Sequence, residues 1–295
     1  MPGEERLSTK NPLARRFNLQ VKMNPEKTRA EVILPGLSYD DFDRTGNVSL
    51  TKLLARISST QMLFELGNEH SDFWMLINSS PALFFVRSMK YRINEELYSM
   101  KKHGPDHTFV CIWQAISTGI SSRYLRYDLT LNGKEMVTLF GQDVYVSKET
   151  KRPTRLPEWY RNKVKTANGT AKRNMAQLIR PIQAFQYNMV VTPSDIDMYN
   201  HVTNSAYIRY CLDAGYQAGI SGFYRNLPGD IAQYRCKEIE QLYDGESNLG
   251  EELCVYTWDT EEEKDTLYFQ IANEKGRPIH HCILRFYQGR ASSKL

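Results

Sequence analysis

Runs of β-branched and aromatic residues dominate the chain, and they come in two sets, each preceded by a helix-like segment. The first set predicts strands over 82–93, 108–118, 124–131 and 136–147. The second set predicts strands over 233–243, 253–258, 266–273 and 280–288. Turn-forming stretches such as NGK and EKGRP separate them. One helix followed by adjacent strands, twice over, predicts an α+β fold.

The first helix-like segment has apolar residues at three-and-four spacing, namely Leu50, Leu53, Leu54 and Ile57. This spacing places them on one face of a helix, and either Ser49 or Thr51 is available to cap its start. An amphipathic helix is therefore expected here.

The second helix-like segment is capped by either Thr203 or Asn204 and continues through the small residues Ala214, Gly215, Ala218 and Gly219. Small side chains allow a neighbouring backbone to approach closely. We therefore expect a buried helix.

The segments leading into these helices form an internal repeat. DDFDRTGNVS aligns with PSDIDMYNHVTN at an offset of 154 residues, from position 43 to position 197. The aligned pairs are Asp41 with Asp195, Asp43 with Asp197, Asn47 with His201, and Val48 with Val202.

The repeat predicts two domains, 15–150 and 182–290, each an antiparallel sheet wrapped around a long central helix. Between them, 151–181 is rich in basic residues and is expected to be a linker. The alternative is that its charges contact the phosphates of an anionic ligand. Residues 291–295 form a tail.

Composition narrows the class of function. The 295 residues carry a net charge of +4 and a pI near 8.6, without the concentrated basic surface of a nucleic-acid-binding protein. Five cysteines without a C-x-x-C pair indicate neither a disulfide framework nor a metal site. No segment has the length and apolarity of a secretory signal or a membrane span.

The chain ends in Ser293, Lys294 and Leu295, the tripeptide that peroxisomal import receptors read at an exposed C-terminus. We therefore expect the peroxisomal matrix as its location and the import receptor as a partner. Acyl-CoA chemistry is abundant in that organelle, which favours an acyl-CoA substrate.

The stretch SDIDMYNHVTNSAY resembles the signature of hotdog-fold thioesterases, in which an Asp-x-Asp segment, a histidine and a tyrosine lead into the central helix. Two such units at this length most resemble acyl-ACP thioesterases, and more distantly the hydroxybenzoyl-CoA thioesterase group. In YDGESNLGEEL, the positions Tyr243, Glu246, Gly250 and Leu253 have the spacing of a second family segment. The resemblance implies a tandem hotdog fold.

The resemblance implies Asp197, His201 and Glu246 as catalytic residues. Tyr199 stands where the family has a catalytic asparagine, and Asn200 lies beside it. Two other positions depart from the family pattern: Thr203 replaces the first asparagine of the usual pair, and Ser247 takes the place of a cysteine found in many relatives. Asn204 keeps the second asparagine.

These groups suit the hydrolysis of a thioester. Backbone N–H groups at the helix start near His201 would stabilise an oxyanion, and His201 would add a side-chain donor. Asp197 and Glu246 would act on the water, one as general base and one as orienter; Asp197 as a direct nucleophile is a further alternative. No cofactor is expected apart from the CoA of the substrate.

The sequence therefore predicts a peroxisomal acyl-CoA thioesterase of fatty acid metabolism. A non-catalytic acyl-CoA-binding protein and an acyl-ACP thioesterase are the alternatives, and a hotdog dehydratase is weaker because no matching histidine segment is found. Since Asn47 replaces the histidine in the first copy, one competent site is expected, in the second half. The first half would shape the acyl pocket, with 74–86 as a candidate wall; the alternative is that this apolar segment belongs to the core. Assembly into a homo-oligomer is left open.

Overall fold

The computed structural model describes residues 20–65, 81–98, 108–164, 175–197 and 200–290. The chain divides into two compact units. The first comprises Met1–Leu37, Arg56–Met89 and His103–Arg173, and the second comprises Ser38–Ala55, Lys90–Lys102 and Asn174–Leu295. Part of the N-terminal half of the sequence thus belongs to the second unit, including the first copy of the repeated loop.

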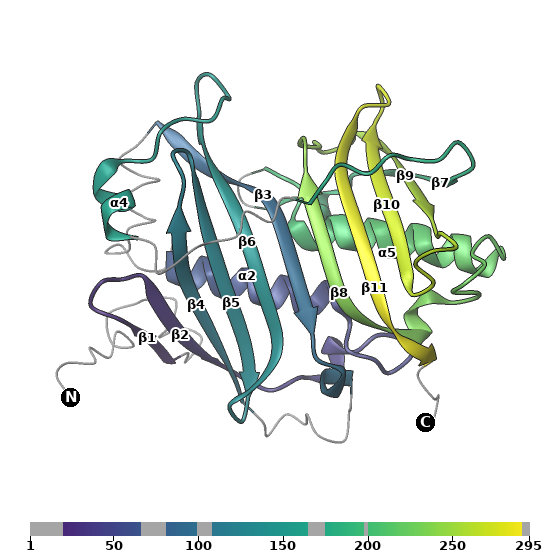
Figure 1. The fold of residues 1–295 in the computed structure, drawn as a ribbon, viewed down its shortest axis with the longest axis horizontal. Helices are drawn as coiled ribbons and strands as arrows, with labels where there is room; N and C mark the ends of the chain where they lie inside the picture. Colours follow the sequence, from purple (N-terminus) through teal and green to yellow (C-terminus); the bar gives the residue numbers. More distant parts are fainter. Residues whose placement is uncertain (1–19, 66–80, 99–107, 165–174, 198–199, 291–295) are drawn as a thin grey trace. The chain divides into compact units, whose positions relative to one another are not determined.

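The first unit is built on a sheet with the strand order β1-β2-β4-β5-β6-β3, in which the neighbouring strands from β1 to β6 pair antiparallel (Figure 1). Its strands are β1 (Gln20–Met23), β2 (Arg29–Leu34), β3 (Ala82–Ile93), β4 (Phe109–Thr118), β5 (Ser122–Leu131) and β6 (Lys134–Ser147). Helix α2 (Leu50–Glu65) begins in the second unit and continues into the first, and α4 (Glu158–Lys163) follows β6. Leu53, Leu54 and Ile57 of α2 are buried, as its apolar spacing predicts.

The described start of the expected linker is packed against the first unit. Leu156, Tyr160 and Val164, four residues apart, are all buried around α4. This spacing places them on one side of a helix, which the high basic content of the segment obscured. Residues 165–174 and the terminal tripeptide 293–295 lie outside the described residues, as does most of the expected pocket wall at 74–86.

The second unit is built on an antiparallel sheet with the order β8-β11-β10-β9-β7, in which β7 is the edge strand. Its elements are β7 (Phe185–Val190), α5 (Asn204–Ile220), β8 (Tyr234–Tyr243), β9 (Glu252–Trp258), β10 (Thr266–Asn273) and β11 (Pro278–Arg290). Helix α5 packs against β7, β9 and β11 (Figure 1). All eight strands predicted from the sequence are present, and the α+β class is confirmed.

Helix α5 is buried, as its small residues predict. Its N-cap is Thr203, whose side chain accepts a hydrogen bond from the Ala206 N–H. At the other end, a Cβ at Gly219 would overlap the carbonyl of Gly229, whose N–H donates to the Gly219 carbonyl at 3.1 Å. Only glycine allows this approach of backbone to backbone.

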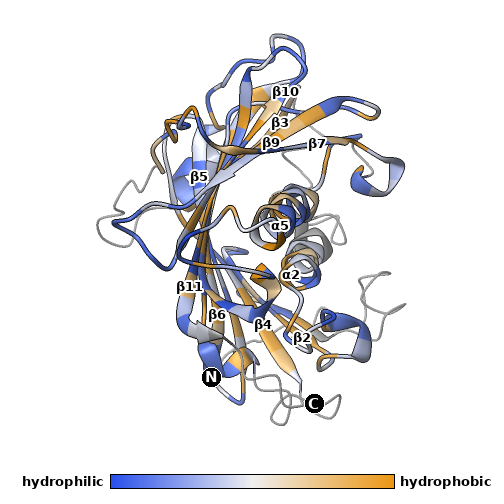
Figure 2. Ribbon diagram, turned by 90° about the vertical axis from the view of Figure 1, so that its right-hand side faces the viewer, coloured by the Kyte–Doolittle hydropathy of each residue, from blue (hydrophilic) through white to orange (hydrophobic). Residues whose placement is uncertain are grey.

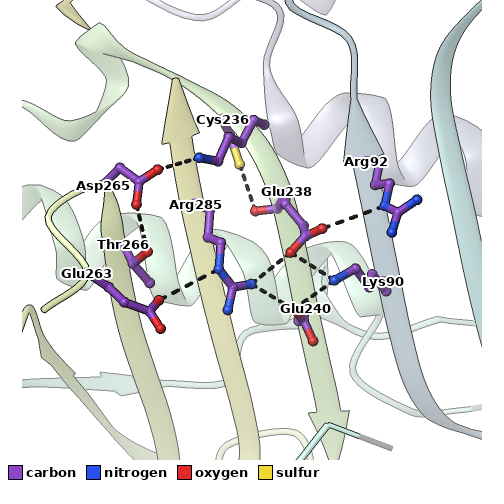
Figure 3. Close-up of polar contacts among 10 residues, drawn as sticks. Lys90, Arg92, Cys236, Glu238, Glu240, Glu263, Asp265, Thr266 and Arg285 are labelled. Atoms are coloured by element: carbon purple, nitrogen blue, oxygen red, sulfur yellow. Dashed lines mark hydrogen bonds and ion pairs between the residues drawn. The ribbon is translucent and has the colours of Figure 1, made fainter. Parts of the chain in front are cut away.

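Apolar and polar residues are interleaved along the strands, as Figure 2 shows. In β4, β5 and β9 buried positions recur at every second residue, which places one face toward a core. On β8, Glu238 and Glu240 share the other face and meet Lys90 of β3 and Arg285 of β11 (Figure 3). Lys90 Nζ lies 2.9 Å from a carboxylate oxygen of each glutamate, and Arg285 Nη1 lies 2.8 Å and 2.6 Å from them. This charge cluster of four residues links β8 and β11 to the end of β3, which from Lys90 onward belongs to the second unit.

Within the described ranges, no helix is both long and apolar enough to cross a bilayer.

Candidate active site

The two copies of the repeated loop have the same backbone structure. Each begins with a short 3-10 helix, Tyr39–Asp41 in one copy and Pro193–Asp195 in the other. In both, a hydroxyl residue and an aspartate three positions later form a capping box. A bridge then closes each loop, from Phe42 to Val48 and from Ile196 to Val202.

The hydrogen bonds of the two loops also correspond. The Asp197 N–H donates to the His201 carbonyl at 2.9 Å, and the Asp43 N–H donates to the Asn47 carbonyl at 2.8 Å. Each aspartate then accepts, through Oδ1, the backbone N–H four residues on, at 3.1 Å from His201 and 3.2 Å from Asn47. The internal repeat is therefore a repeat of structure.

Asn200, a candidate site residue from the sequence, occupies a turn position that requires a left-handed backbone. Asn200 has a φ of 64°, and Gly46 at the matching position has a φ of 79°. Asparagine tolerates this left-handed conformation better than most residues, and its N–H donates to the Asp197 carbonyl at 3.0 Å. Asn200 thus shapes the turn before His201. Met198 and Tyr199 lie outside the described residues.

Asp195 anchors the loop to α5. It is 2% exposed, accepts hydrogen bonds from the N–H and hydroxyl of Thr192 at 2.8 Å each, and pairs with the guanidinium of Arg209. Burial alone would raise its pKa, but the bonds from Thr192 and the charge of Arg209 hold the pKa below its usual value. Asp195 stays ionised, and its carbonyl accepts the Thr203 N–H at 2.9 Å just before the helix begins.

The structure brings the three predicted catalytic residues together. His201 Nε2 lies 4.0 Å from Glu246 Oε2, although the two residues are 45 positions apart in the sequence. Their side chains are 37% and 53% exposed, so both are open to a substrate. Asp197 joins them through its bond to the His201 N–H, and Asn204 is the first residue of α5.

The loop that carries Glu246 is held at both ends. The N–H groups of Asp244 and Gly245 donate to the Ile279 carbonyl at 2.8 Å and 3.1 Å, and the Gly250 N–H donates to the Val191 carbonyl at 2.9 Å. A Cβ at Gly245 would lie 2.9 Å from Ile279 Cγ2, so the loop start fits tightly against β11. Glu246 is therefore on a fixed loop.

Ser247 fixes the middle of this loop to α5. It is 1% exposed, and its Oγ lies 2.8 Å from the hydroxyl of Tyr207. The Tyr207 ring stacks on the imidazole of His280 at 4.9 Å and meets the Tyr243 ring edge-on at 5.6 Å. Burial raises the pKa of Tyr207, so its hydroxyl keeps its proton. The sequence showed Tyr207 only as part of the signature and gave it no role.

The adjacent histidines on β11 face opposite sides of the sheet, as the strand period predicts. His280 is fully buried on the α5 side, where Nε2 lies 3.2 Å from Gln241 Oε1 and burial lowers its pKa to about 3. On the other side, His281 Nδ1 accepts the Leu178 N–H at 3.2 Å and Nε2 lies 3.2 Å from Asp244 Oδ2. Neither histidine is placed with His201.

The first copy of the loop is bonded to residues 230–232, just before β8. Asn47, at the position of His201, is 7% exposed, and its side-chain N–H donates to the Ala232 carbonyl at 3.0 Å. Thr45 donates to the same carbonyl at 3.2 Å, and Arg44 pairs with Asp230 at 2.8 Å. This first loop fastens the segment that leads into β8.

Among the described residues, no three histidine, cysteine, aspartate or glutamate side chains gather as metal ligands would. Cys211 lies in the core of the second unit and is fully buried, which fits packing better than nucleophilic attack.

Most of the second unit is similar to a known protein family. Residues 180–288 match the family model described as the acyl-ACP thioesterase C-terminal domain. An acyl-ACP thioesterase from Bacteroides thetaiotaomicron superposes with a TM-score of 0.69 at 13% identity, over 90% of this chain and 100% of that one. No curated protein sequence matches the chain.

A plant structure shares the same fold. The 12:0-ACP thioesterase from Umbellularia californica superposes with a TM-score of 0.69 at 11% identity, over 88% of this chain and 97% of that one. At such identities the likeness shows the fold, which is of the hotdog type. The resemblance read from the signature is thereby confirmed, and the match of residues 180–288 to the acyl-ACP thioesterase C-terminal domain supports a thioester hydrolase.

Proposed function

We propose that this chain hydrolyses fatty acyl thioesters, with acyl-CoA as the preferred form, at a site made of His201, Glu246 and the start of α5. The approach of His201 Nε2 to Glu246 Oε2, at 4.0 Å beside a helix N-terminus, carries the proposal. The matching loops also support a tandem hotdog with one helix, α2 or α5, at the centre of each half.

Glu246 is the general base in this proposal, and Asp197 orients the turn that carries His201. Asp197 uses Oδ1 to accept the His201 N–H, and Asp43 makes the same bond in a loop that has no histidine. An aspartate retained in the copy without histidine is explained by the turn it builds. Glu246, 53% exposed and close to the imidazole, is free to take a proton from water at the thioester carbon.

The oxyanion would be stabilised at the helix start. The N–H groups of His201 and Thr203 already donate within the loop, and Thr203 Oγ1 accepts the Ala206 N–H. The imidazole of His201 and the first-turn amides after Thr203, beginning with Asn204, are the donors we assign to the oxyanion. The thiolate of CoA leaves without needing a strong acid.

The carrier of the acyl group is a choice between CoA and ACP. The terminal Ser293-Lys294-Leu295 motif motivates CoA and a peroxisomal location, whereas the matched domain and the named neighbours motivate ACP. A thiol-release assay with the same acyl chains on CoA and on ACP distinguishes them. A higher kcat/KM on ACP for every chain length would contradict the CoA proposal.

The catalytic assignment is tested by His201→Ala and Glu246→Gln. Each should lower kcat about 10²–10⁴-fold, because each removes a group that acts on a proton or a developing charge. Wild-type activity in either variant would defeat the site assignment. Tight acyl-CoA binding without thiol release from any acyl chain would instead favour a binding protein.

A further inference from the structure

The position of Glu246 depends on a contact in the middle of its loop. The ends of the loop are fixed by the Ile279 and Val191 carbonyls: Asp244 and Gly245 bond to the first and Gly250 to the second, but none of these bonds is made by the residues that directly follow Glu246. Ser247 is the next residue, and it is buried while Glu246 points outward, with 53% of its side chain exposed. Because Ser247 is fixed in the core, the backbone beside it is fixed too, and this restricts the direction of the Glu246 side chain.

We infer that the Tyr207–Ser247 hydrogen bond is a positioning device that holds the Glu246 carboxylate beside His201. This inference rests on the proposed function, and neither residue is assigned contact with substrate. The bond joins two hydroxyls at 2.8 Å in a buried setting, 40 residues apart in the sequence.

The arrangement couples both halves of the site to one helix. His201 lies three residues before the start of α5, and Tyr207 lies in its first turn, so the helix that follows the histidine also contacts the glutamate loop. The stack on His280 and the edge contact with Tyr243 fix the Tyr207 ring, which leaves its hydroxyl few alternative positions. Loss of the Tyr207–Ser247 hydrogen bond would release the middle of the loop, while the Tyr207 ring would still fill its place in the core.

Kinetics of Tyr207→Phe and Ser247→Ala test the inference. Each variant should lower kcat about 10-fold or more with KM nearly unchanged, since misplacement of a reacting group by about 1 Å can cost up to 10²-fold. Tyr224→Phe is the matched control, because Tyr224 also bonds through its hydroxyl to a buried hydroxyl, Thr257 Oγ1 at 2.6 Å, away from this loop. It should keep the wild-type kcat.

A double-mutant cycle separates positioning from general damage. If Tyr207 acts through Glu246, Tyr207→Phe should cost little more once Glu246→Gln is present. An equal loss of kcat in both backgrounds, or an unchanged kcat in Tyr207→Phe, would overturn the inference.

Hydrogen exchange supplies a readout that needs no activity. Peptides covering 244–251 should exchange faster in Tyr207→Phe than in the wild type and in Tyr224→Phe. Unchanged exchange in Tyr207→Phe would overturn the positioning role even in an active enzyme. The absence of thiol release from every thioester would instead defeat the proposed function, while the exchange result would still decide whether Tyr207 places the loop.

Discussion

Asp197 and Asp43 make the same hydrogen bond in two loops, one with a histidine and one without. In both, the carboxylate accepts the backbone N–H four residues on, which is the contact that shapes an Asx-type turn. At the scale of single residues, this match assigns the Asp197 carboxylate to the turn, whereas Glu246 is the carboxylate proposed to act on water.

Asp197→Asn should therefore retain much of the activity. The asparagine side-chain oxygen can accept the His201 N–H as the aspartate does, whereas alanine cannot. We expect kcat/KM within about 10-fold of the wild type for Asp197→Asn and a loss of about 10²-fold or more for Asp197→Ala. If both variants lose activity as strongly as Glu246→Gln, Asp197 takes part in the chemistry as base or nucleophile.

The candidate site residues were proposed from the sequence because their spacing follows a family signature. Asp197 and His201 lie in one short motif, and Glu246 lies in a second. The hydroxyl bond between Tyr207 and Ser247 could not be predicted, since it depends on how the loop after β8 returns to α5. Contacts between distant segments leave no periodic pattern in a sequence.

At the scale of elements, predicted strands were those with long runs of apolar residues. Strand β7 was missed because its residues alternate between half-buried and exposed, with none fully buried, as an edge strand allows. Strands β1 and β2 were also missed, and β1 spans only four residues. Helix α4 was hidden by basic residues, although Tyr160 within it and Leu156 and Val164 on either side are buried.

The charge cluster of Lys90, Glu238, Glu240 and Arg285 should stabilise the second unit in a pH-dependent way. Burial would raise the pKa of Glu240, but its bonds to Lys90 and Arg285 hold the pKa below the usual 4.5. A carboxyl whose pKa is lowered by folding contributes fully above its unfolded pKa and loses that contribution as pH falls through the folded pKa. The cluster should thus lose this stabilisation only below about pH 4.5.

Glu240→Gln tests this expectation. Urea unfolding at pH 7 should show a loss of about 1–3 kcal/mol in the free energy of unfolding relative to the wild type, as for other hydrogen bonds to charged groups. The difference should shrink as the pH is lowered through and below 4.5. A difference that is constant from pH 7 to pH 3 would show that the charge of Glu240 is not the cause.

At the scale of the whole molecule, the two loops have the same backbone but different partners. Asn47 donates to Ala232, while His201 faces Glu246. Asn47→Ala removes the bonds of the side-chain amide to the Ala232 carbonyl and to Thr45 Oγ1. It should therefore lower the free energy of unfolding by about 1–3 kcal/mol and leave kcat/KM within about twofold. His201→Ala should instead lower kcat/KM strongly and leave the free energy of unfolding nearly unchanged. Thiol release and urea unfolding of both variants, measured side by side, test the expectation of one competent site per chain.

Location is a property of the whole chain that the fold does not decide. If the terminal tripeptide is read by the import receptor, a fluorescent protein fused to the N-terminus should enter peroxisomes, and deletion of Leu295 should leave it outside. The same distribution with and without Leu295 would contradict the proposed location.

Three histidines differ in burial, and this difference allows the candidate site to be labelled selectively. His201 has a side chain that is 37% exposed, whereas His280 and His281 are 0% and 2% exposed. Within the described part of the chain, an acylating reagent specific for imidazole should thus modify His201 ahead of the other two. Mass spectrometry of the modified peptide, with and without bound acyl-CoA, would then report occupancy of the site without any measurement of turnover.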